Sequence, residues 1–366
     1  MSGEIARLGS GISGSVFSIP EDPQHDVAGG EPSQLLSPVA IASLGDSRLV
    51  TAHRASPDIL QVTAWALDET GSLSRTSQLA GDPATAISLC AVTLNRVVSV
   101  VRNGLGNLEL VVWDVDRGQL IRRGTGHAGE VTAVAVCAVS ASRVVAVMRN
   151  GSGNLELISW DIDGNGNLQR RGTGEAGGVW AVGVTAVTES RVVAVMKNLS
   201  LNLELIVWDV TGDGAFIRRG EGDAGTVGAV SIASLGTGKV IAVMRNGSHD
   251  LELIVWDIDE DGHMKRRGYG LAGVGDVFTQ EKSNIGVTAN PQYGTVVSAA
   301  RNKIGDLELT SWYVNNEGIV SRQSTVSAEA ISAVAISGLD EHHFHHFATA
   351  VCDGQGQLEC IAWTVA

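Results

Sequence analysis

Residues 131–177 read VTAVAVCAVSASRVVAVMRNGSGNLELISWDIDGNGNLQRRGTGEAG, and similar stretches follow at 178–225 and 226–273. Each stretch has four short runs rich in Val, Ile, Leu and Ala, separated by Gly, Asn, Asp and Ser, which predicts four strands joined by tight turns. We name these strands A to D in chain order; in the quoted repeat they are VTAVAV, RVVAVM, LELISW and NLQRRG. Such nearly continuous apolar runs are typical of strands that are buried on both faces.

One Trp at the end of strand C marks the repeat along the whole chain. These residues are Trp65, Trp113, Trp160, Trp208, Trp256, Trp312 and Trp363, and subtracting their numbers gives spacings of 48, 47, 48, 48, 56 and 51 residues. A four-strand unit with this period is typical of a β-propeller, where each sheet buries its faces against its neighbours around a central channel.

The two ends of the chain are predicted to share one unit. Only three residues follow Trp363, so the last unit lacks strand D, and the amino-terminal GEIARLGSGISG matches strand D of the quoted repeat with Arg7 in the place of Arg170. The prediction is therefore an all-β, seven-bladed propeller of four-stranded blades, closed by the N-terminal strand. The expected boundaries are 1–14 for the closing strand, 15–37 for an inserted loop, 38–81, 82–129, 130–177, 178–225, 226–273 and 274–328 for blades 1 to 6, and 329–366 for strands A to C of blade 7.

The repeat resembles the WD40 propellers. Strand C ends in a Trp-Asp pair at Trp113-Asp114, Trp160-Asp161, Trp208-Asp209 and Trp256-Asp257, and Gly126-His127 is similar to the Gly-His element of that family. The other three Trp residues lack the Asp, and only one unit keeps the His. The resemblance therefore implies a WD40-like fold and neither a specific partner nor the family's Asp–His network.

The charge and hydropathy of the chain exclude several classes of partner. A net charge of −14 argues against general affinity for nucleic acid or acidic membranes. No run approaches the roughly 20 apolar residues of a membrane span, and the start MSGEIARLGSG has no apolar signal core. We expect a cytoplasmic protein, although glycosylation sequons at Asn150, Asn198 and Asn246 leave open a secreted form trimmed of its signal peptide.

Several recurring residues are interpreted as structural. Strand D carries one Arg per unit and strand C one Glu, or Gln in the first unit, and the two are expected to pair across neighbouring strands. In blade order these are Arg75, Arg122, Arg170, Arg218, Arg266, Arg322 and Arg7 with Gln61, Glu109, Glu156, Glu204, Glu252, Glu308 and Glu359. The Asp-rich turns between strands C and D resemble the start of a calcium loop but lack its twelfth-position Glu, so they are interpreted as hairpin turns. Cys352 and Cys360 are interpreted as buried thiols, with a disulfide as the alternative. The run 342–346, with four His, is interpreted as a solvated loop, and no metal site is predicted.

The candidate site is a ring of cations at the end of strand B: Arg54, Arg102, Arg149, Lys197, Arg245 and Arg301, followed in the last unit by Asp353. By analogy with WD40 propellers, this end of strand B and the segments between strands D and A share one face, so the ring should surround the channel mouth. Residues that do not repeat there are His127, Glu175, Asp223, Tyr269 and Trp180. One interpretation is that each cation binds loop carbonyls or a nearby carboxylate. The other is an asymmetric pocket for a ligand with anionic or polar oxygens, since clustered like charges repel unless a partner anion compensates them.

The function hypothesis is a small-molecule pocket at this mouth, and the chain carries no catalytic motif of known spacing and no cofactor-binding motif. If the protein is an enzyme, a cofactor-independent cyclisation, cycloaddition or elimination fits best, with Arg149 and Arg245 as electrophilic anchors and Asp353 or His127 as the proton-transferring group. Arg54, Arg102, Lys197, Arg301, Trp180, Tyr269, Glu175 and Asp223 would bind the substrate. A protein-interaction scaffold and a glycan-binding lectin stay open as alternatives.

Overall fold

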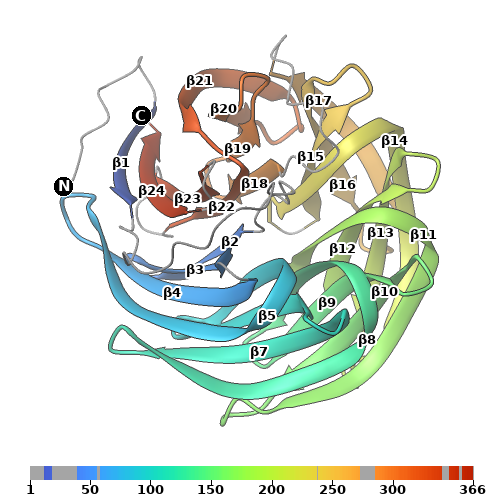
Figure 1. Ribbon diagram of the computed structural model, residues 1–366. Helices are drawn as coiled ribbons and strands as arrows, with labels where there is room; N and C mark the ends of the chain where they lie inside the picture. Colours follow the sequence, from blue (N-terminus) through green and yellow to red (C-terminus); the bar gives the residue numbers. More distant parts are fainter. Residues whose placement is uncertain are drawn as a thin grey trace, which may run out of the picture.

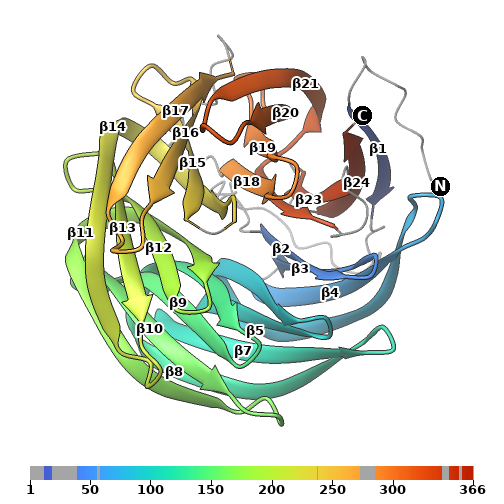
Figure 2. The ribbon, with the colours of Figure 1, turned by 180° about the vertical axis from the view of Figure 1, so that it is seen from behind.

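The computed structural model describes residues 12–18, 39–55, 58–236, 238–272, 285–339, 346–353 and 357–365, and the described residues form strands and turns only. Figure 1 shows the strands arranged as sheets around a common centre, and Figure 2 shows the same ring from behind. The predicted all-β propeller class is confirmed. Among the described residues, no helix has the length and apolar character needed to cross a bilayer.

Four long strands each belong to two blades. Strands β5 (Leu73–Thr93), β8 (Gln119–Ser140), β11 (Leu168–Thr188) and β14 (Phe216–Ser234) pair first as strand D of one blade and then as strand A of the next. For example, Leu168–Gly178 of β11 pairs with β10, and Val179–Thr188 pairs with β12. The predicted loops between strands D and A are therefore absent in these four places, because the extended backbone continues from the outer edge of one sheet to the inner edge of the next.

The remaining strands complete the described sheets. Blade 1 adds β2 (Val39–Gly45), β3 (Arg48–Ala55) and β4 (Ile59–Leu67); blade 2, β6 (Arg96–Asn103) and β7 (Asn107–Asp116); blade 3, β9 (Arg143–Asn150) and β10 (Asn154–Ile162); blade 4, β12 (Arg191–Asn198) and β13 (Asn202–Val210); blade 5, β15 (Lys239–Asn246), β16 (Leu251–Ile258) and β17 (Met264–Leu271); blade 6, β18 (Ile285–Asn290), β19 (Thr295–Arg301), β20 (Asp306–Val314) and β21 (Val320–Ala330); and blade 7, β22 (Ala333–Gly338), β23 (His346–Cys352), β24 (Leu358–Val365) and β1 (Ile12–Ser18).

The N-terminal strand pairs with the C-terminal one, but in a register that differs from the prediction. Strand β1 runs antiparallel to β24 and places Gly14 opposite Trp363. In the other blades the residue opposite the Trp is the strand D Arg, as in Trp160 and Arg170. The prediction placed Arg7 opposite Trp363 in a strand within 1–14, but the paired strand is Ile12–Ser18 and the residue opposite Trp363 is Gly14. Arg7 itself lies outside the described residues. The sequence match followed Gly and Arg positions, whereas pairing follows ISGSVFS, which is richer in strand-forming Ile, Val and Phe.

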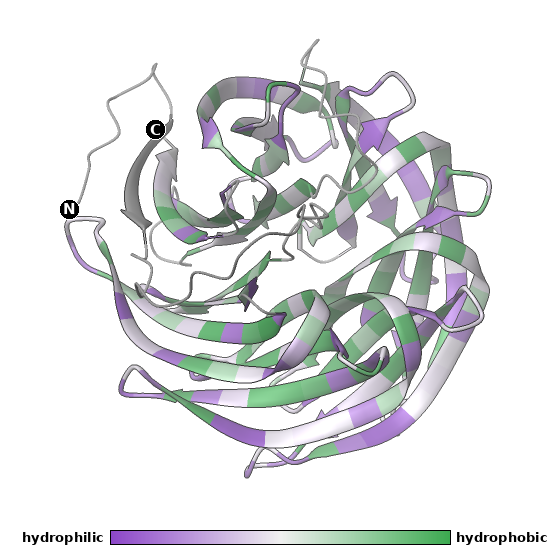
Figure 3. Cartoon of the chain, in the orientation of Figure 1, coloured by the Kyte–Doolittle hydropathy of each residue, from purple (hydrophilic) through white to green (hydrophobic). Residues whose placement is uncertain are grey.

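The repeated Trp residues are buried at the contacts between blades. In blades 1, 2, 6 and 7 the indole Nε1 donates a 2.9 Å hydrogen bond to a hydroxyl fourteen residues earlier, on Thr51, Ser99, Ser298 and Thr349. Blades 3 to 5 carry Ala146, Ala194 and Ala242 at that position, and the Nε1 atoms of their Trp residues have no partner among the described residues. Figure 3 shows hydrophobic residues along the strands and hydrophilic ones at the protruding turns.

Glycines on strand D allow neighbouring blades to approach closely. A Cβ at Gly124, Gly172, Gly220 or Gly268 would lie 2.4, 2.3, 2.2 or 2.2 Å from the carbonyl oxygen of Gly166, Gly214, Gly262 or Gly318, in the turn between strands C and D of the next blade. Two residues later, a Cβ at Gly222 would lie 2.8 Å from the ring of Trp256 in the next blade. The Gly-x-Gly pattern of the repeat is thus explained by blade stacking.

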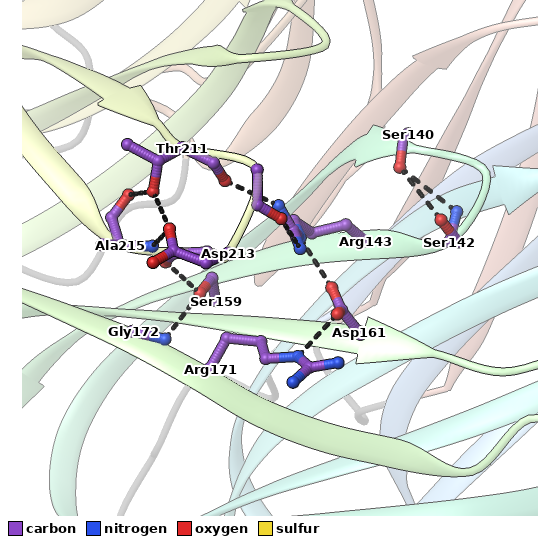
Figure 4. Close-up of polar contacts among 12 residues, drawn as sticks. Ser140, Ser142, Arg143, Ser159, Asp161, Arg171, Gly172, Thr211, Asp213 and Ala215 are labelled. Atoms are coloured by element: carbon purple, nitrogen blue, oxygen red, sulfur yellow. Dashed lines mark hydrogen bonds and ion pairs between the residues drawn. The ribbon is translucent and has the colours of Figure 1, made fainter.

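The Asp of each Trp-Asp pair binds a basic residue that reaches the next blade, as Figure 4 shows for Asp161 and Arg143. Its carboxylate accepts hydrogen bonds of 2.6 Å from Nε of both Arg143 and Arg171, and Arg143 donates further bonds to the carbonyls of Thr211 and Gly212 in the next blade. The bond from Arg143, followed by that from Arg171, holds the pKa of Asp161 below its usual value. Equivalent clusters surround Asp114, Asp209 and Asp257.

The predicted pairing between strands C and D is confirmed in blades 2 to 5. The Arg–Glu distances are 3.3 Å for Arg122–Glu109, 3.5 Å for Arg170–Glu156, 4.0 Å for Arg218–Glu204 and 3.2 Å for Arg266–Glu252. The same Glu residues accept hydrogen bonds from the amide nitrogens of Asn103, Asn150, Asn198 and Asn246. The Asn residues of the three sequons therefore have a structural role within their own blades.

Candidate functional site

Strand pairing places the six predicted cations at equivalent positions. Each lies opposite a Leu at the start of strand C, in the pairs Arg54–Leu60, Arg102–Leu108, Arg149–Leu155, Lys197–Leu203, Arg245–Leu251 and Arg301–Leu307. All six therefore lie at the face of the propeller that carries the turns between strands B and C. We call this the BC face.

Asp353 does not belong to this series. In blade 7 the residue opposite the corresponding Leu358 is Cys352, so the seventh ring position holds a buried thiol. Asp353 takes the place of Asn150 and Asn302, whose side-chain oxygens accept backbone amides of the BC turn. Its own Oδ1 accepts the amide of Gln357 at 2.9 Å. The sequence alignment missed this one-residue shift because blade 7 has Cys352 where the other blades have a cation; Asp353 can replace Asn because a carboxylate caps a turn as an amide does.

Four other predicted site residues lie on the outer strands. His127, Glu175, Asp223 and Tyr269 are exposed and lie opposite Glu109, Glu156, Glu204 and Ile254 on strand C of their own blades. They were expected in loops at the channel mouth, and that expectation is corrected, because strand D continues in extended pairing through these positions. The structure does not bring them together with the ring.

Three of the six ring cations donate to backbone carbonyls of the BC face, and a fourth pairs with a carboxylate. Arg102 donates from Nε to the carbonyl of Val131 at 2.8 Å and from Nη1 to the hydroxyl of Thr85 at 3.0 Å. Arg149 makes the same pair of bonds, to the carbonyl of Val179 at 2.6 Å and to Thr132 at 2.8 Å. Arg301 donates to the carbonyl of Gly305, and Arg54 forms a 3.3 Å ion pair with Asp58. The interpretation of the ring as carbonyl-binding cations therefore applies to a large part of it.

Blade 4 departs from this pattern at two adjacent positions. The residue that bulges out of strand A is Thr85 in blade 2 and Thr132 in blade 3, but Trp180 in blade 4, where it is 53% exposed. The ring cation beside it is Lys197, which lies opposite Ala181, the next residue after the bulge. Lys197 is half-buried, and its side chain has no hydrogen bond or ion pair within the described part of the chain.

The blades on either side complete the asymmetry. The guanidinium of Arg149 in blade 3 lies over the ring of Trp180, 5.1 Å from its centroid, a cation–π geometry. In blade 5 the irregular stretch between Val227 and Val230 has Gly228 at the position of Trp180, and Arg245 is only 5% exposed. A Cβ at Gly228 would lie 2.1 Å from Nη2 of Arg245, so only glycine leaves room for this arrangement. Trp180 thus contacts Arg149 and lies next to Lys197 in the strand pairing, and we call these three residues the blade 4 site.

The structure also has a cavity that the sequence did not reveal. It measures about 1020 Å³ and lies at the turns between strands A and B of blades 6, 7, 1 and 2, at the face opposite the BC face. Its lining includes Ser43, Thr93, Asn290, His346 and Phe347. These residues come from turns that differ between the blades, so the repeat gave no signal for them.

A second feature that the sequence did not reveal is a buried histidine. His53 is 4% exposed, and its Nδ1 has no partner among the described residues. It lies opposite Gln61, at the position held by Met148, Met196 and Met244 in blades 3 to 5. Burial lowers the pKa of His53 to about 4.

The cysteines are free, and Cys352 and Cys360 are buried as expected. They are not opposite one another, since Cys352 lies opposite Leu358 and Cys360 opposite Ala350. Burial raises the pKa of the Cys352 thiol to about 12. In the His-rich run, residues 342–345 lie outside the described residues. Within the described ranges no group of three or more His, Cys, Asp or Glu side chains is placed to hold a metal ion.

Comparisons with known proteins support the fold. No family model matches the sequence, and a search of curated proteins finds no match, so the WD40 resemblance has no support at the level of family. Similar solved structures include the periplasmic gluconolactonase of Pseudomonas aeruginosa, with a TM-score of 0.59, 14% identity and coverage of 88% of this chain and 94% of that one. A proposed 6-phosphogluconolactonase from Bacteroides fragilis has a TM-score of 0.60 and 13% identity, over 80% and 85% of the two chains. A Lactobacillus plantarum protein has a TM-score of 0.59 and 13% identity, over 85% and 94%. At this identity the likeness concerns the propeller fold.

Proposed function

We propose that the protein binds a small sugar-derived acid, or the lactone that corresponds to it, at the blade 4 site. The observation that carries the proposal is Lys197, a half-buried residue whose ammonium has no partner among the described residues and which lies next to the exposed Trp180 in the strand pairing. A carboxylate or phosphate would pair with Lys197 and with the guanidinium of Arg149, in charge-assisted hydrogen bonds. The carbon skeleton of a sugar would lie against the face of the indole.

The names of the similar structures agree with this ligand class. Two of them are described as acting on gluconolactones, which are sugar-derived and hydrolyse to carboxylates. Neither these structures nor the blade 4 site favours a cyclisation or a scaffold role. Asp353 and His127 are left out of the proposed site, because Asp353 caps a turn and His127 lies on an outer strand.

We expect Lys197→Ala to weaken binding of 6-phosphogluconate by about tenfold or more, since a hydrogen bond to a charged group contributes about 1.5–3 kcal/mol. Trp180→Thr, which installs the residue of blades 2 and 3, should weaken binding about fivefold through loss of the stacking surface. Isothermal titration calorimetry measures both effects.

The control for Lys197→Ala is Lys265→Ala, which removes an exposed lysine from outer strand β17 and should leave the affinity unchanged. Equal affinity of the Lys197→Ala variant and the parent protein, or equal losses in the two lysine variants, would contradict the proposal. Titration with glucono-δ-lactone in a pH-stat would show in the same samples whether acid is released faster than by spontaneous hydrolysis.

A further inference from the structure

The turn between strands B and C of blade 4 is apolar and exposed. It reads Leu199-Ser200-Leu201, where blade 3 has Gly151-Ser152-Gly153. Leu199 is 58% exposed and Leu201 is 44% exposed, and both turns close with the same backbone bond, from Leu201 to Asn198 and from Gly153 to Asn150. The leucines are therefore not needed to form the turn.

Leu201 adopts a backbone conformation that is unfavourable for its residue type. Its φ is +66°, in the left-handed region, where Gly106, Gly153 and Gly305 occupy the equivalent positions with φ of +84°, +83° and +98°. Among the described blades the other non-glycine residues at this position are Asp58 of blade 1, with φ of +71°, and His249 of blade 5, with φ of +68°. A side chain with a Cβ destabilises the folded state here relative to glycine. An exposed leucine in such a place adds apolar surface at a cost in stability.

This surface adjoins the blade 4 site. Leu199 packs over Gly178, since a Cβ at Gly178 would lie 2.5 Å from Leu199 Cδ1. Gly178 is two residues from Trp180, and Asn198, which follows Lys197, lies opposite Val179. The two exposed leucines thus lie in the turn that follows Lys197, and Leu199 lies next to the strand segment that carries the exposed Trp180.

We propose that the ligand of the blade 4 site carries an apolar group, aryl or alkyl, next to its anionic group. The inference rests on the proposed function and refines its ligand class. The anion pairs with Lys197, the sugar lies on Trp180, and the apolar group covers Leu199 and Leu201. A small molecule fits this patch better than a protein partner, because three side chains on the rim of one blade supply far less area than the roughly 800 Å² that each partner of a stable protein complex buries.

The test compares two ligands with the same anionic sugar, methyl β-D-glucuronide and 4-nitrophenyl β-D-glucuronide. We expect the aryl compound to bind about tenfold more tightly in calorimetry, because it buries apolar surface that the methyl compound leaves exposed. Replacing Leu199-Ser200-Leu201 with Gly-Ser-Gly, the turn of blade 3, should abolish this preference and leave the affinity for the methyl compound unchanged.

The turn exchange has two controls. Its urea unfolding should stay cooperative with a midpoint close to that of the parent, because the gain from glycine at the left-handed position 201 offsets the loss of Leu199, and this shows that the variant folds. The reverse exchange in blade 3, Gly151→Leu with Gly153→Leu, should leave the aryl preference intact. Equal binding of the two glucuronides, or an aryl preference that persists after the turn exchange, would overturn the inference while leaving the proposed function standing. Absence of binding by either glucuronide and by 6-phosphogluconate would overturn both.

Discussion

Replacing Gly220 with Ala is expected to destabilise the propeller by about 3 kcal/mol or more, at the upper end of the range for overpacked sites. The added Cβ would lie 2.2 Å from the carbonyl oxygen of Gly262 in the next blade. This neighbour is backbone, so no side-chain rotation relieves the overlap, and blades 4 and 5 would have to separate. Urea unfolding of both proteins measures the loss.

A matched control lies five residues further along the same strand. A Cβ at Gly225 would have no atom within 4 Å, and its φ lies outside the left-handed region. Gly225→Ala should therefore leave stability the same or raise it slightly, by less than about 1 kcal/mol. If Gly220→Ala and Gly225→Ala unfold at the same urea concentration, the close stacking of blades through Gly-x-Gly is wrong.

The neutral, buried His53 should lower the free energy of unfolding by about 3 kcal/mol when the pH falls from 7.5 to 4, and the substitution His53→Met should remove this loss. Burial lowers the pKa of His53 from its usual 6.5 to about 4 in the folded protein. The imidazole of the unfolded chain therefore binds a proton at a higher pH than that of the folded protein. The free energy of unfolding is unaffected by His53 above pH 6.5, falls as the pH drops from 6.5 towards 4, and loses nothing further from this group below pH 4. Met is the residue of blades 3 to 5 at this position, so it fits the repeat.

The measurement is the free energy of unfolding of both proteins at pH values from 7.5 to 4. All other titrating groups remain in both, so the difference between the two curves isolates His53. We expect that difference to widen by about 3 kcal/mol across the window, on top of a constant gain of about 1 kcal/mol from removing a buried Nδ1 that lacks a partner. Parallel curves would show that His53 is not buried as described.

The parts of the structure that repeat could be predicted from the sequence. The Trp spacing gave the propeller, and the Arg and Glu series gave the pairing between strands C and D, because both depend on contacts that every blade makes. The Trp-Asp pairs were noted in the sequence without a role for their Asp, because the clusters around Asp161 and its equivalents use Arg residues from strands B and D that the sequence analysis did not connect. These contacts join residues on different strands, and the sequence alone does not show which residues of two strands lie opposite one another.

The parts that depart from the repeat were harder to predict. Strand D was expected to end before His127 and Glu175, yet glycine-rich segments continue in extended pairing and carry these residues along the outer edge. Asp353 was placed one residue out of register, because the last unit has Cys352 where the others have a cation. Trp180 was recognised as an exception to the repeat and Lys197 as a member of the cation ring, and the structure places the two residues next to one another in the strand pairing.

The most direct test of the proposed binding site is a crystal structure of the protein soaked with 6-phosphogluconate. We expect an anionic group of the ligand within hydrogen-bonding distance of Lys197 Nζ, with the carbon skeleton against the ring of Trp180. Ligand bound instead in the cavity between the A–B turns of blades 6, 7, 1 and 2, with Lys197 and Trp180 unoccupied, would contradict it.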